Sequence, residues 1–222
     1  ERLEELLRVN DAPHPRGLLI ALEGGEGVGK STQIRLLANA LRQRGLEVVE
    51  TREPGGTEGA EAIRTLLLGG LTDRWNPQSE ALLFAAARAD HVARVIHPAL
   101  ERGAWVLSDR FIDSNRAYQA GASGLADADI MAAHRIGSGG LMPDRTLLLT
   151  LPLDVAAERA ALRDAGRADR FGARGQAFHM CVTEAFHALA AQEPARIRMI
   201  DAMGSEEAVS ARILSEMADL LP

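Results

Sequence analysis

The amino-acid sequence predicts an α/β fold with a five-stranded parallel sheet and helices on both of its faces. Short apolar runs alternate with longer helical patterns along the 222 residues. The short runs are apolar at consecutive positions, as expected for strands that are buried on both faces. Hydrophobic residues make up 46% of the chain and charged residues 25%, which is typical of a globular protein and excludes wholesale disorder.

Each expected element is bounded by a local signal. The first strand is the run Leu-Leu-Ile-Ala-Leu at residues 18–22. A helix follows at residues 31–44, where Ile34, Leu37 and Leu41 share one face and Gly45 ends the pattern. A long helix at residues 80–100 is ended by Gly103. Further strands are expected at residues 46–51, 105–108, 146–151 and 197–200, and further helices at residues 58–68, 155–163, 177–191 and 206–221. Open sheets of this kind bind ligands beyond the carboxyl ends of their strands, so motifs at those ends carry most weight.

Composition and charge narrow the possible functions. Residues 1–16 are predicted to be an N-terminal extension or linker and residues 17–222 to form one domain, because no linker divides them. The acidic start lacks the apolar core of a secretory signal, and no run approaches ~18 apolar residues, so no membrane span is expected. The single cysteine, Cys181, excludes an intrachain disulfide and suits the cytoplasm. A net charge of −6 argues against a nucleic acid or an anionic membrane as partner.

A phosphate loop is the most specific motif. Residues 24–31 read Gly-Gly-Glu-Gly-Val-Gly-Lys-Ser, which matches G-x-x-x-x-G-K-[ST] between an expected strand and an expected helix. In such a loop the backbone N–H groups and the helix N-terminus hold phosphates, the lysine binds the outer phosphates and the serine hydroxyl ligates Mg²⁺. The motif therefore predicts a P-loop NTPase fold. The predicted ATP-binding residues are Gly24, Gly25, Glu26, Gly27, Val28, Gly29, Lys30, Ser31 and Thr32.

Lys30 is also the only lysine among the 25 Lys and Arg residues. The planar fork of arginine is a poor replacement for a compact ammonium group at this position, which accounts for a lysine here in a chain that otherwise uses arginine. The same count excludes the switch-type GTPases in their usual form, because their guanine-reading N-K-x-D motif needs a second lysine.

Polar residues gather after the other strands. Asp109 would support Mg²⁺ through water, and Arg110 beside it would clamp a phosphate, with a buried ion pair as the alternative. The polar, glycine-punctuated stretch 111–124 suits recognition of a base or sugar, or is a plain surface loop. An arginine-rich segment after the fourth strand predicts a mobile lid at about residues 163–175, or a solvated charged loop. Its arginines are Arg159, Arg163, Arg167, Arg170 and Arg174.

Together these motifs resemble the thymidylate kinase family. The family's T-R-E-P-G-G-T run stands at residues 51–57, its D-R-[FYH] at 109–111 and its S-x-x-A-Y-Q at 114–119. The resemblance runs from Gly17 to about Leu220. It implies an enzyme, working as a homodimer, that transfers the γ-phosphoryl group of MgATP to dTMP and so gives dTDP and ADP for dTTP synthesis. A kinase for another monophosphate, with dUMP or dGMP the first to test, and a P-loop regulator without transfer chemistry are the alternatives.

The resemblance implies roles around the acceptor. Phe84 would stack on thymine and Arg88, in the family's A-A-R context, would bind the base or its monophosphate. Tyr118 would lie under the deoxyribose and disfavour a 2′-hydroxyl. Asn115 and Gln119 would line the base pocket. The implied substrate-binding residues are Glu26, Pro54, Phe84, Arg88, Arg110, Asn115, Tyr118 and Gln119, with Pro54 as a cis proline.

It also implies the phosphoryl-transfer residues. Glu26 would face the sugar 3′-hydroxyl, and Arg110 would hold the acceptor phosphate. Gly27 in the phosphate loop and an arginine-rich lid resemble the lid-arginine type that is usual in bacteria. The implied catalytic residues are Lys30, Glu26, Arg110, Arg163, Arg167 and Arg170, with the choice among the three lid arginines open, and the expected metal ligands are Ser31 and Asp109.

Overall fold

The computed structural model describes residues 16–164 and 169–221, so the expected N-terminal extension lies almost wholly outside the described residues. The strands are β1 (Leu19–Glu23), β2 (Val48–Arg52), β3 (Trp105–Asp109), β4 (Arg145–Thr150) and β5 (Ile197–Asp201). They form one sheet in the order β2-β3-β1-β4-β5, and every neighbouring pair is parallel. The α/β fold class and the five predicted strands are confirmed, with ends that differ by one or two residues.

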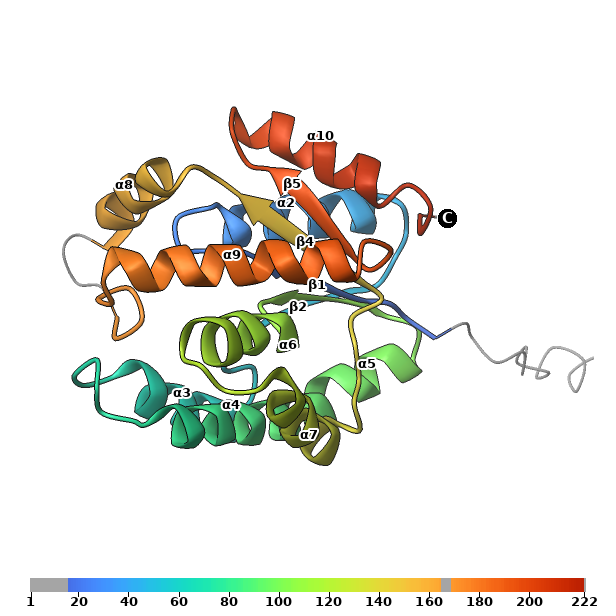
Figure 1. The fold of residues 1–222 in the computed structure, drawn as a ribbon. Helices are drawn as coiled ribbons and strands as arrows, with labels where there is room; N and C mark the ends of the chain where they lie inside the picture. Colours follow the sequence, from blue (N-terminus) through green and yellow to red (C-terminus); the bar gives the residue numbers. More distant parts are fainter. Residues whose placement is uncertain (1–15, 165–168, 222) are drawn as a thin grey trace, which may run out of the picture.

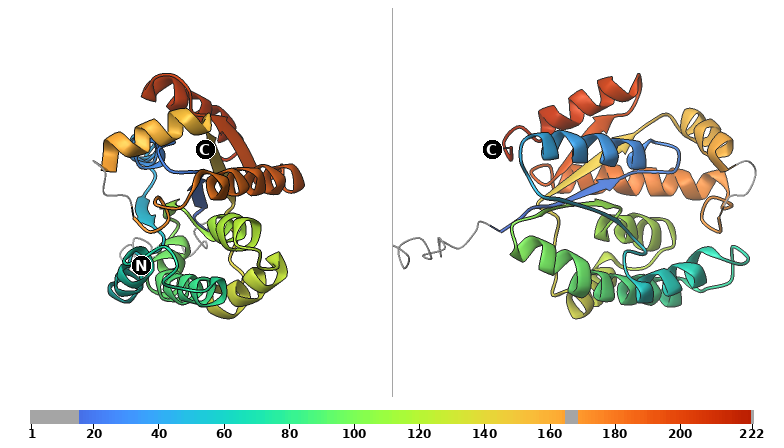
Figure 2. Two further views of the ribbon diagram at one scale, coloured as in Figure 1. Left: turned by 60° about the vertical axis from the view of Figure 1, so that its left-hand side comes forward. Right: turned by 180° about the vertical axis from the view of Figure 1, so that it is seen from behind.

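The helices cover both faces of this sheet (Figure 1). They are α2 (Lys30–Gln43), α3 (Glu58–Leu68), α4 (Pro77–His91), η1 (Val92–Ile96), α5 (His97–Glu101), α6 (Ile112–Asn115), η2 (Arg116–Ala122), α7 (Asp127–Ser138), α8 (Leu153–Asp164), α9 (Gln176–Gln192) and α10 (Glu206–Glu216), where η marks a π-helical stretch. Helices α2 and α10 lie on one face, and α4, α5, α7 and α9 lie on the other (Figures 1 and 2).

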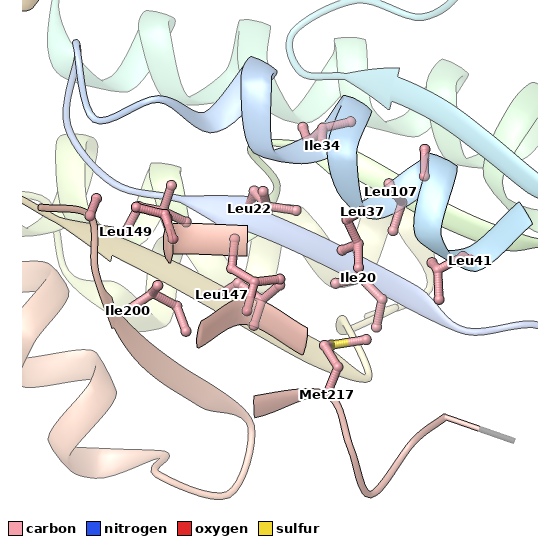
Figure 3. Close-up of a cluster of buried hydrophobic side chains, with 14 of the residues drawn as sticks. Ile20, Leu22, Ile34, Leu37, Leu41, Leu107, Leu147, Leu149, Ile200 and Met217 are labelled. Atoms are coloured by element: carbon pink, nitrogen blue, oxygen red, sulfur yellow. The ribbon is translucent and has the colours of Figure 1, made fainter. Parts of the chain in front are cut away.

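Alternating side chains of the central strand feed a core on each face. Ile20 and Leu22 of β1 point towards α2 and α10, where they join a cluster that ends at Met217 (Figure 3). Leu19 and Ala21 of the same strand point to the opposite face and pack with residues of η1 and α5. Burial on both faces explains why β1 is apolar at four consecutive positions, residues 19–22.

Two helices differ in length from the sequence prediction. The helix expected at 80–100 begins earlier because the Asn76 side chain caps it, accepting the backbone N–H of Ser79 at 2.7 Å, and it continues through η1 and α5 to Glu101. The helix expected at 206–221 ends at Glu216. There the Arg145 guanidinium donates to the Glu216 carbonyl, and the next residue, Met217, is fully buried in the core.

The stretch 111–124 is largely helical and buried, whereas its composition also allowed a surface loop. The carboxylate of Glu23, at the end of β1, accepts the backbone N–H groups of Phe111 at 2.7 Å and Ser114 at 3.0 Å, so a residue distant in sequence satisfies the start of α6. Gly121 does not interrupt the helix. A Cβ atom at Gly121 would lie 2.3 Å from the Cβ of Ala185, so glycine lets η2 approach α9 closely.

His134 of α7 is buried as a neutral imidazole. One ring nitrogen bonds the Leu141 carbonyl at 2.8 Å and the other the Ser138 hydroxyl at 2.9 Å. Burial, with the charge of Arg88 adding to it, lowers the pKa of His134 to about 4. Between about pH 6.5 and pH 4 the unfolded chain therefore binds a proton at His134 that the folded chain does not. The contribution of the neutral imidazole to the free energy of unfolding is present above pH 6.5 and is lost as the pH falls.

When the pH falls from 7 to 5, we expect the protonation of His134 in the unfolded chain to lower the free energy of unfolding by about 2 kcal/mol. Urea denaturation of the wild type and of His134→Gln at both pH values measures this contribution as the difference between the two pH dependences. Because the other titrating groups are present in both proteins, their effects cancel. Equal pH dependences in the two proteins would contradict the prediction.

Candidate active site

The phosphate loop connects β1 to α2 at the carboxyl end of the sheet, beside β3 and β4 (Figure 1). Its fold requires glycine at two positions. Gly24 has a φ of +129°, and a Cβ atom there would lie 2.4 Å from the Leu149 carbonyl oxygen of β4. Gly27 has a φ of +72°, and its Cβ atom would lie 2.1 Å from the Ala156 carbonyl oxygen of α8. The loop therefore lies directly against β4 and α8, and α2 begins at Lys30 immediately after it.

Lys30 is held over this loop. Its Nζ donates to the carbonyl oxygens of Gly24 at 3.1 Å and Gly25 at 2.7 Å. Burial lowers the pKa of Lys30 to about 8, and the charge of Arg110 acts in the same direction. An ammonium group whose charge its surroundings disfavour gains from an anionic ligand, so this arrangement suits a phosphate.

Ser31 and Asp109 meet beside the lysine. The Ser31 hydroxyl at the start of α2 donates to Asp109 Oδ2 at 2.9 Å, although 78 positions separate the two residues in the chain. A hydroxyl and a carboxylate match the oxygen ligands of Mg²⁺, which commonly takes few protein groups and completes its shell with water and phosphate. Within the described residues there is no cluster of three or more His, Cys, Asp or Glu that could hold a metal.

Arg110, the first residue after β3, lies beside the phosphate loop. It has a φ of +71°, the only positive value among the described non-glycine residues, and its Nη1 donates to the Gly24 carbonyl and the Ser114 hydroxyl, both at 3.1 Å. The guanidinium also lies 5.2 Å from the centre of the Tyr118 ring. The unusual backbone thus turns the side chain towards the phosphate loop.

Glu23, the last residue of β1, binds the start of α6 next to Arg110. It is fully buried, and Ser114 Oγ donates to its carboxylate at 2.6 Å in addition to the two backbone N–H groups at the start of α6. Burial raises the pKa of Glu23 to about 7, against the opposing charge of Arg110. Its bonds explain why an acid follows the apolar run of β1, since Glu23 joins the phosphate loop to α6.

A cavity of about 510 Å³ is lined by the phosphate loop and by side chains that include Phe84, Arg88 and Gln119. The lining combines residues of the phosphate loop and α2 with aromatic, amide and arginine side chains from β2, α3, α4, the 110–119 segment, α8 and residue 171. Those of the predicted site residues that line it are Glu26, Gly27, Gly29, Lys30, Ser31, Thr32, Pro54, Phe84, Arg88, Asp109, Arg110, Asn115, Tyr118 and Gln119. The structure therefore places these residues around one space. The remaining loop residues, Gly24, Gly25 and Val28, line a neighbouring cavity of about 830 Å³.

The far end of the cavity holds a buried ion pair. The Nε of Arg88 donates to Glu53 Oε2 at 2.7 Å, and both side chains are 3% exposed. The other carboxylate oxygen of Glu53 lies 3.1 Å from His91 Nδ1. Pro54, which follows Glu53, has the expected cis peptide bond.

Amide side chains continue from this pair. Asn115 Oδ1 accepts from Arg88 Nη2, and Asn115 Nδ2 donates to Gln119 Oε1 at 2.8 Å. Phe84 flanks the same space and its ring lies 5.8 Å from that of Phe171. The end of the cavity thus combines an aromatic wall with a donor and an acceptor, which is the chemistry that recognises a planar base.

Sequence reasoning missed Arg52 and Arg64, and it counted Arg159 among the arginines after the fourth strand without assigning it to the site. Arg52 and Arg64 line the cavity, and Arg64 Nη1 also donates to the Pro54 carbonyl at 2.8 Å. Arg159 of α8 is exposed and lines the cavity on the phosphate-loop side. Its position four residues before Arg163 was the available signal, whereas nothing local marks Arg64.

Arg170 does not face the phosphate loop. Its Nε donates to the Leu67 carbonyl at 2.8 Å, its Nη1 to the Thr72 carbonyl at 3.2 Å and its Nη2 to Glu80 Oε2 at 2.5 Å, and the side chain is fully buried. These partners occupy all three nitrogens, so Arg170 is bound to α3, α4 and the loop between them, whereas the sequence predicted a lid arginine that faces the phosphates. The buried carboxylate of Glu80 requires a cation beside it, which explains the difference. Arg167 and the side chain of Arg163 lie outside the described residues.

Comparisons with known proteins show which proteins the chain is similar to. The family model for "Thymidylate kinase" matches residues 22–213. A thymidylate kinase of Rhizorhabdus wittichii is 62% identical over 206 residues, covering 93% of this chain and 99% of the relative. One of Caulobacter vibrioides is 52% identical over 201 residues, covering 89% and 94%. The crystal structure of thymidylate kinase from Ehrlichia chaffeensis superposes with a TM-score of 0.73 at 29% identity, covering 92% of this chain and 99% of that one.

Proposed function

We propose how the chain works, given that it belongs to the thymidylate kinase family and phosphorylates dTMP to dTDP with ATP. It works with Mg²⁺ and binds both substrates in the cavity between the phosphate loop and Arg88. The observation that carries the proposal is the shared cavity, in which Lys30 and Arg110 lie at one end and Phe84, Arg88 and Asn115 at the other. Such a space accommodates a monophosphate whose base is remote from the reacting group.

The chemistry needs little from the protein beyond positioning and charge. The acceptor is itself an anionic phosphate, so no strong general base is required. Lys30 binds the outer phosphates of ATP, and Arg110 holds the acceptor phosphate in line with them. Glu26, in the phosphate loop, faces the sugar 3′-hydroxyl of dTMP. Ser31 and Asp109 would hold Mg²⁺, which would supply positive charge next to the transferred phosphoryl group.

The lid completes the charge neutralisation. We assign this role to Arg163 or Arg167, as in the lid-arginine type of the family. Arg159 is a third candidate, because it is exposed and lines the cavity on the side of the phosphate loop. Arg170 is set aside, since its guanidinium is committed to Leu67, Thr72 and Glu80.

A substrate panel tests this proposal. ADP release at saturating ATP is measured with dTMP, dUMP and dGMP, each with Mg²⁺ and again with excess chelator. The proposal expects dTMP to be preferred and turnover to require Mg²⁺. Equal rates with the three monophosphates would reject the assigned acceptor pocket, and unchanged turnover in chelator would reject the metal.

We also propose a homodimer in the cytoplasm. Among the described helices, none combines the length and hydropathy that a membrane span needs. Leu82 of α4 is 63% exposed and Ile136 of α7 is 89% exposed, and these two helices pack against each other (Figure 1). A second copy of the chain covering this face would bury both side chains and remove their apolar surface from water.

Light scattering tests the dimer. The wild type is expected at twice the 23.8 kDa mass of the chain, and Leu82→Glu/Ile136→Glu at about the mass of one chain, because two charges cannot be buried unpaired in the contact. The exposed Leu162 on α8, changed to Glu, is the matched control. A wild type at 23.8 kDa contradicts the proposal, as does a double variant that stays dimeric.

A further inference from the structure

Glu80 of α4 connects to the acceptor pocket through a directed chain of hydrogen bonds. Arg88 Nη2 donates to Asn115 Oδ1, Asn115 Nδ2 donates to Gln119 Oε1 at 2.8 Å, and Gln119 Nε2 donates to Glu80 Oε1 at 2.7 Å. The four side chains are each between 1% and 3% exposed. A buried chain of this kind is protected from exchange with water and its bonds reinforce one another.

The charged ends of the chain fix the orientation of both amides. A carboxamide carries a donor and an acceptor of nearly the same shape, so Asn115 and Gln119 could each flip. The guanidinium of Arg88 only donates, and the carboxylate of Glu80 only accepts. With both ends present, only one direction leaves every member of the chain satisfied.

Glu80 is itself held from the opposite side. Its second oxygen, Oε2, accepts from Arg170 Nη2 at 2.5 Å and from Arg174 Nη2 at 2.9 Å. Both arginines belong to the arginine-rich segment at about residues 163–175, for which the sequence predicted a lid. One oxygen of the carboxylate therefore accepts from the arginines and the other accepts from Gln119. The carboxylate cannot donate a hydrogen bond to Gln119.

The direction of the chain matches the base edge of the substrate. Arg88 and Asn115 line the cavity next to each other, and the second lone pair of Asn115 Oδ1 remains an acceptor. Thymine and uracil present an acceptor at O4 beside the N3–H donor, whereas cytosine presents the N4 amino donor beside an acceptor. A donor beside an acceptor in the pocket fits the first pattern and opposes the second.

We propose that Glu80 is a positioning residue that sets base specificity, because it fixes the direction of the Gln119–Asn115 amide chain and so keeps an acceptor facing N3–H. Glu80 acts through Gln119 and does not itself touch the base. The proposal rests on the proposed function, since it takes the end of the cavity at Arg88 as the base pocket.

The isosteric variant Glu80→Gln places a hydrogen-bond donor next to Gln119 where the wild type has an acceptor. Arg170 and Arg174 require an acceptor, so the oxygen of the new amide takes the Oε2 position and its NH₂ faces Gln119. Gln119 must then present its oxygen to the new amide and its NH₂ to Asn115. Asn115 in turn would direct its own NH₂ at Arg88, where two donors oppose each other, so one bond of the chain breaks.

A charge-conserving swap restores the chain. In Glu80→Gln/Gln119→Glu, the NH₂ of the new amide on α4 donates to the new carboxylate on η2, and that carboxylate accepts Asn115 Nδ2 as Gln119 Oε1 does in the wild type. The direction at Asn115 and the net charge are both recovered. A Glu80 that served only to neutralise Arg170 and Arg174 would predict no such rescue, since the swap moves the charge away from them.

The experiment measures kcat/KM for dTMP and dUMP and the inhibition constant of dCMP in the wild type, in Glu80→Gln and in the swap. Glu184→Gln on the exposed side of α9 is the matched control. Glu80→Gln is expected to lose about tenfold in kcat/KM for both dTMP and dUMP while dCMP binds no more weakly, as for one lost hydrogen bond. The swap is expected to recover most of that loss.

The outcomes separate the proposals. A wild type that forms no ADP with dTMP would overturn the proposed function itself. An active wild type in which Glu80→Gln leaves the preference for dTMP over dCMP unchanged would overturn only the role of Glu80, and so would a folded swap that recovers none of the preference. If Glu80→Gln fails to fold, the swap decides alone: wild-type preference supports the role, and a lost preference rejects it.

Discussion

Replacing Lys30 with alanine is expected to lower kcat by about a hundredfold or more, because the ammonium stabilises charge that develops in the transition state. In the structure its hydrogen bonds go to the carbonyl oxygens of Gly24 and Gly25, and burial already lowers its pKa. Removing a cation whose charge burial disfavours should leave the free energy of unfolding unchanged or raise it. Steady-state kinetics and a urea melt of Lys30→Ala measure both quantities.

Two further variants make this result specific. Lys30→Arg is expected to recover less than about a tenth of the wild-type kcat, since the planar fork does not fit where a compact ammonium lies over the loop. Arg35→Ala removes a cation from the exposed side of the same helix and should leave kcat within about twofold, as a solvated charge contributes little. A Lys30→Ala enzyme with kcat within about tenfold of the wild type would contradict the role.

Local signals predicted the part of the site that follows the strands. The glycines, Lys30 and Ser31 stand in one run of the sequence, and Asp109 ends the strand next to β1, so parallel pairing alone brings them together. Short apolar runs likewise predicted the five strands. Their ends are set by pairing and shift by a residue or two because hydrophobicity does not mark where the last ladder bond falls.

Buried charges were less predictable, because their partners are remote in sequence. Arg170 lies in an arginine-rich run that has the composition of a mobile lid, yet it is bound to Glu80, 90 positions earlier. Glu23 is the last residue of β1, and its partners Phe111 and Ser114 are 88 and 91 positions away. A single sequence shows a charged residue but not the opposite charge that the tertiary structure places beside it. The sequence therefore favours the interpretation that the charged side chain is exposed to solvent.

Arg88→Met is expected to lower the free energy of unfolding by about 3–5 kcal/mol, because it leaves the Glu53 carboxylate buried without its cation. Both side chains are 3% exposed, so solvent cannot take the place of the guanidinium. Arg102→Met is the matched control: it breaks an Arg–Glu pair in which the side chains are 48% and 57% exposed, and such a pair contributes roughly 0–1 kcal/mol. Equal losses in the two variants, measured by urea denaturation, would contradict the prediction.

Stability and substrate recognition by Arg88 should separate in a double variant. Arg88→Met/Glu53→Gln removes both charges, so most of the lost stability is expected to return. The KM for dTMP should stay raised by about tenfold or more, because methionine offers no donor to the base and no longer holds Asn115 Oδ1 in place. If the double variant recovers the wild-type KM together with its stability, then Arg88 serves only to pair with Glu53 and the base is recognised elsewhere in the cavity.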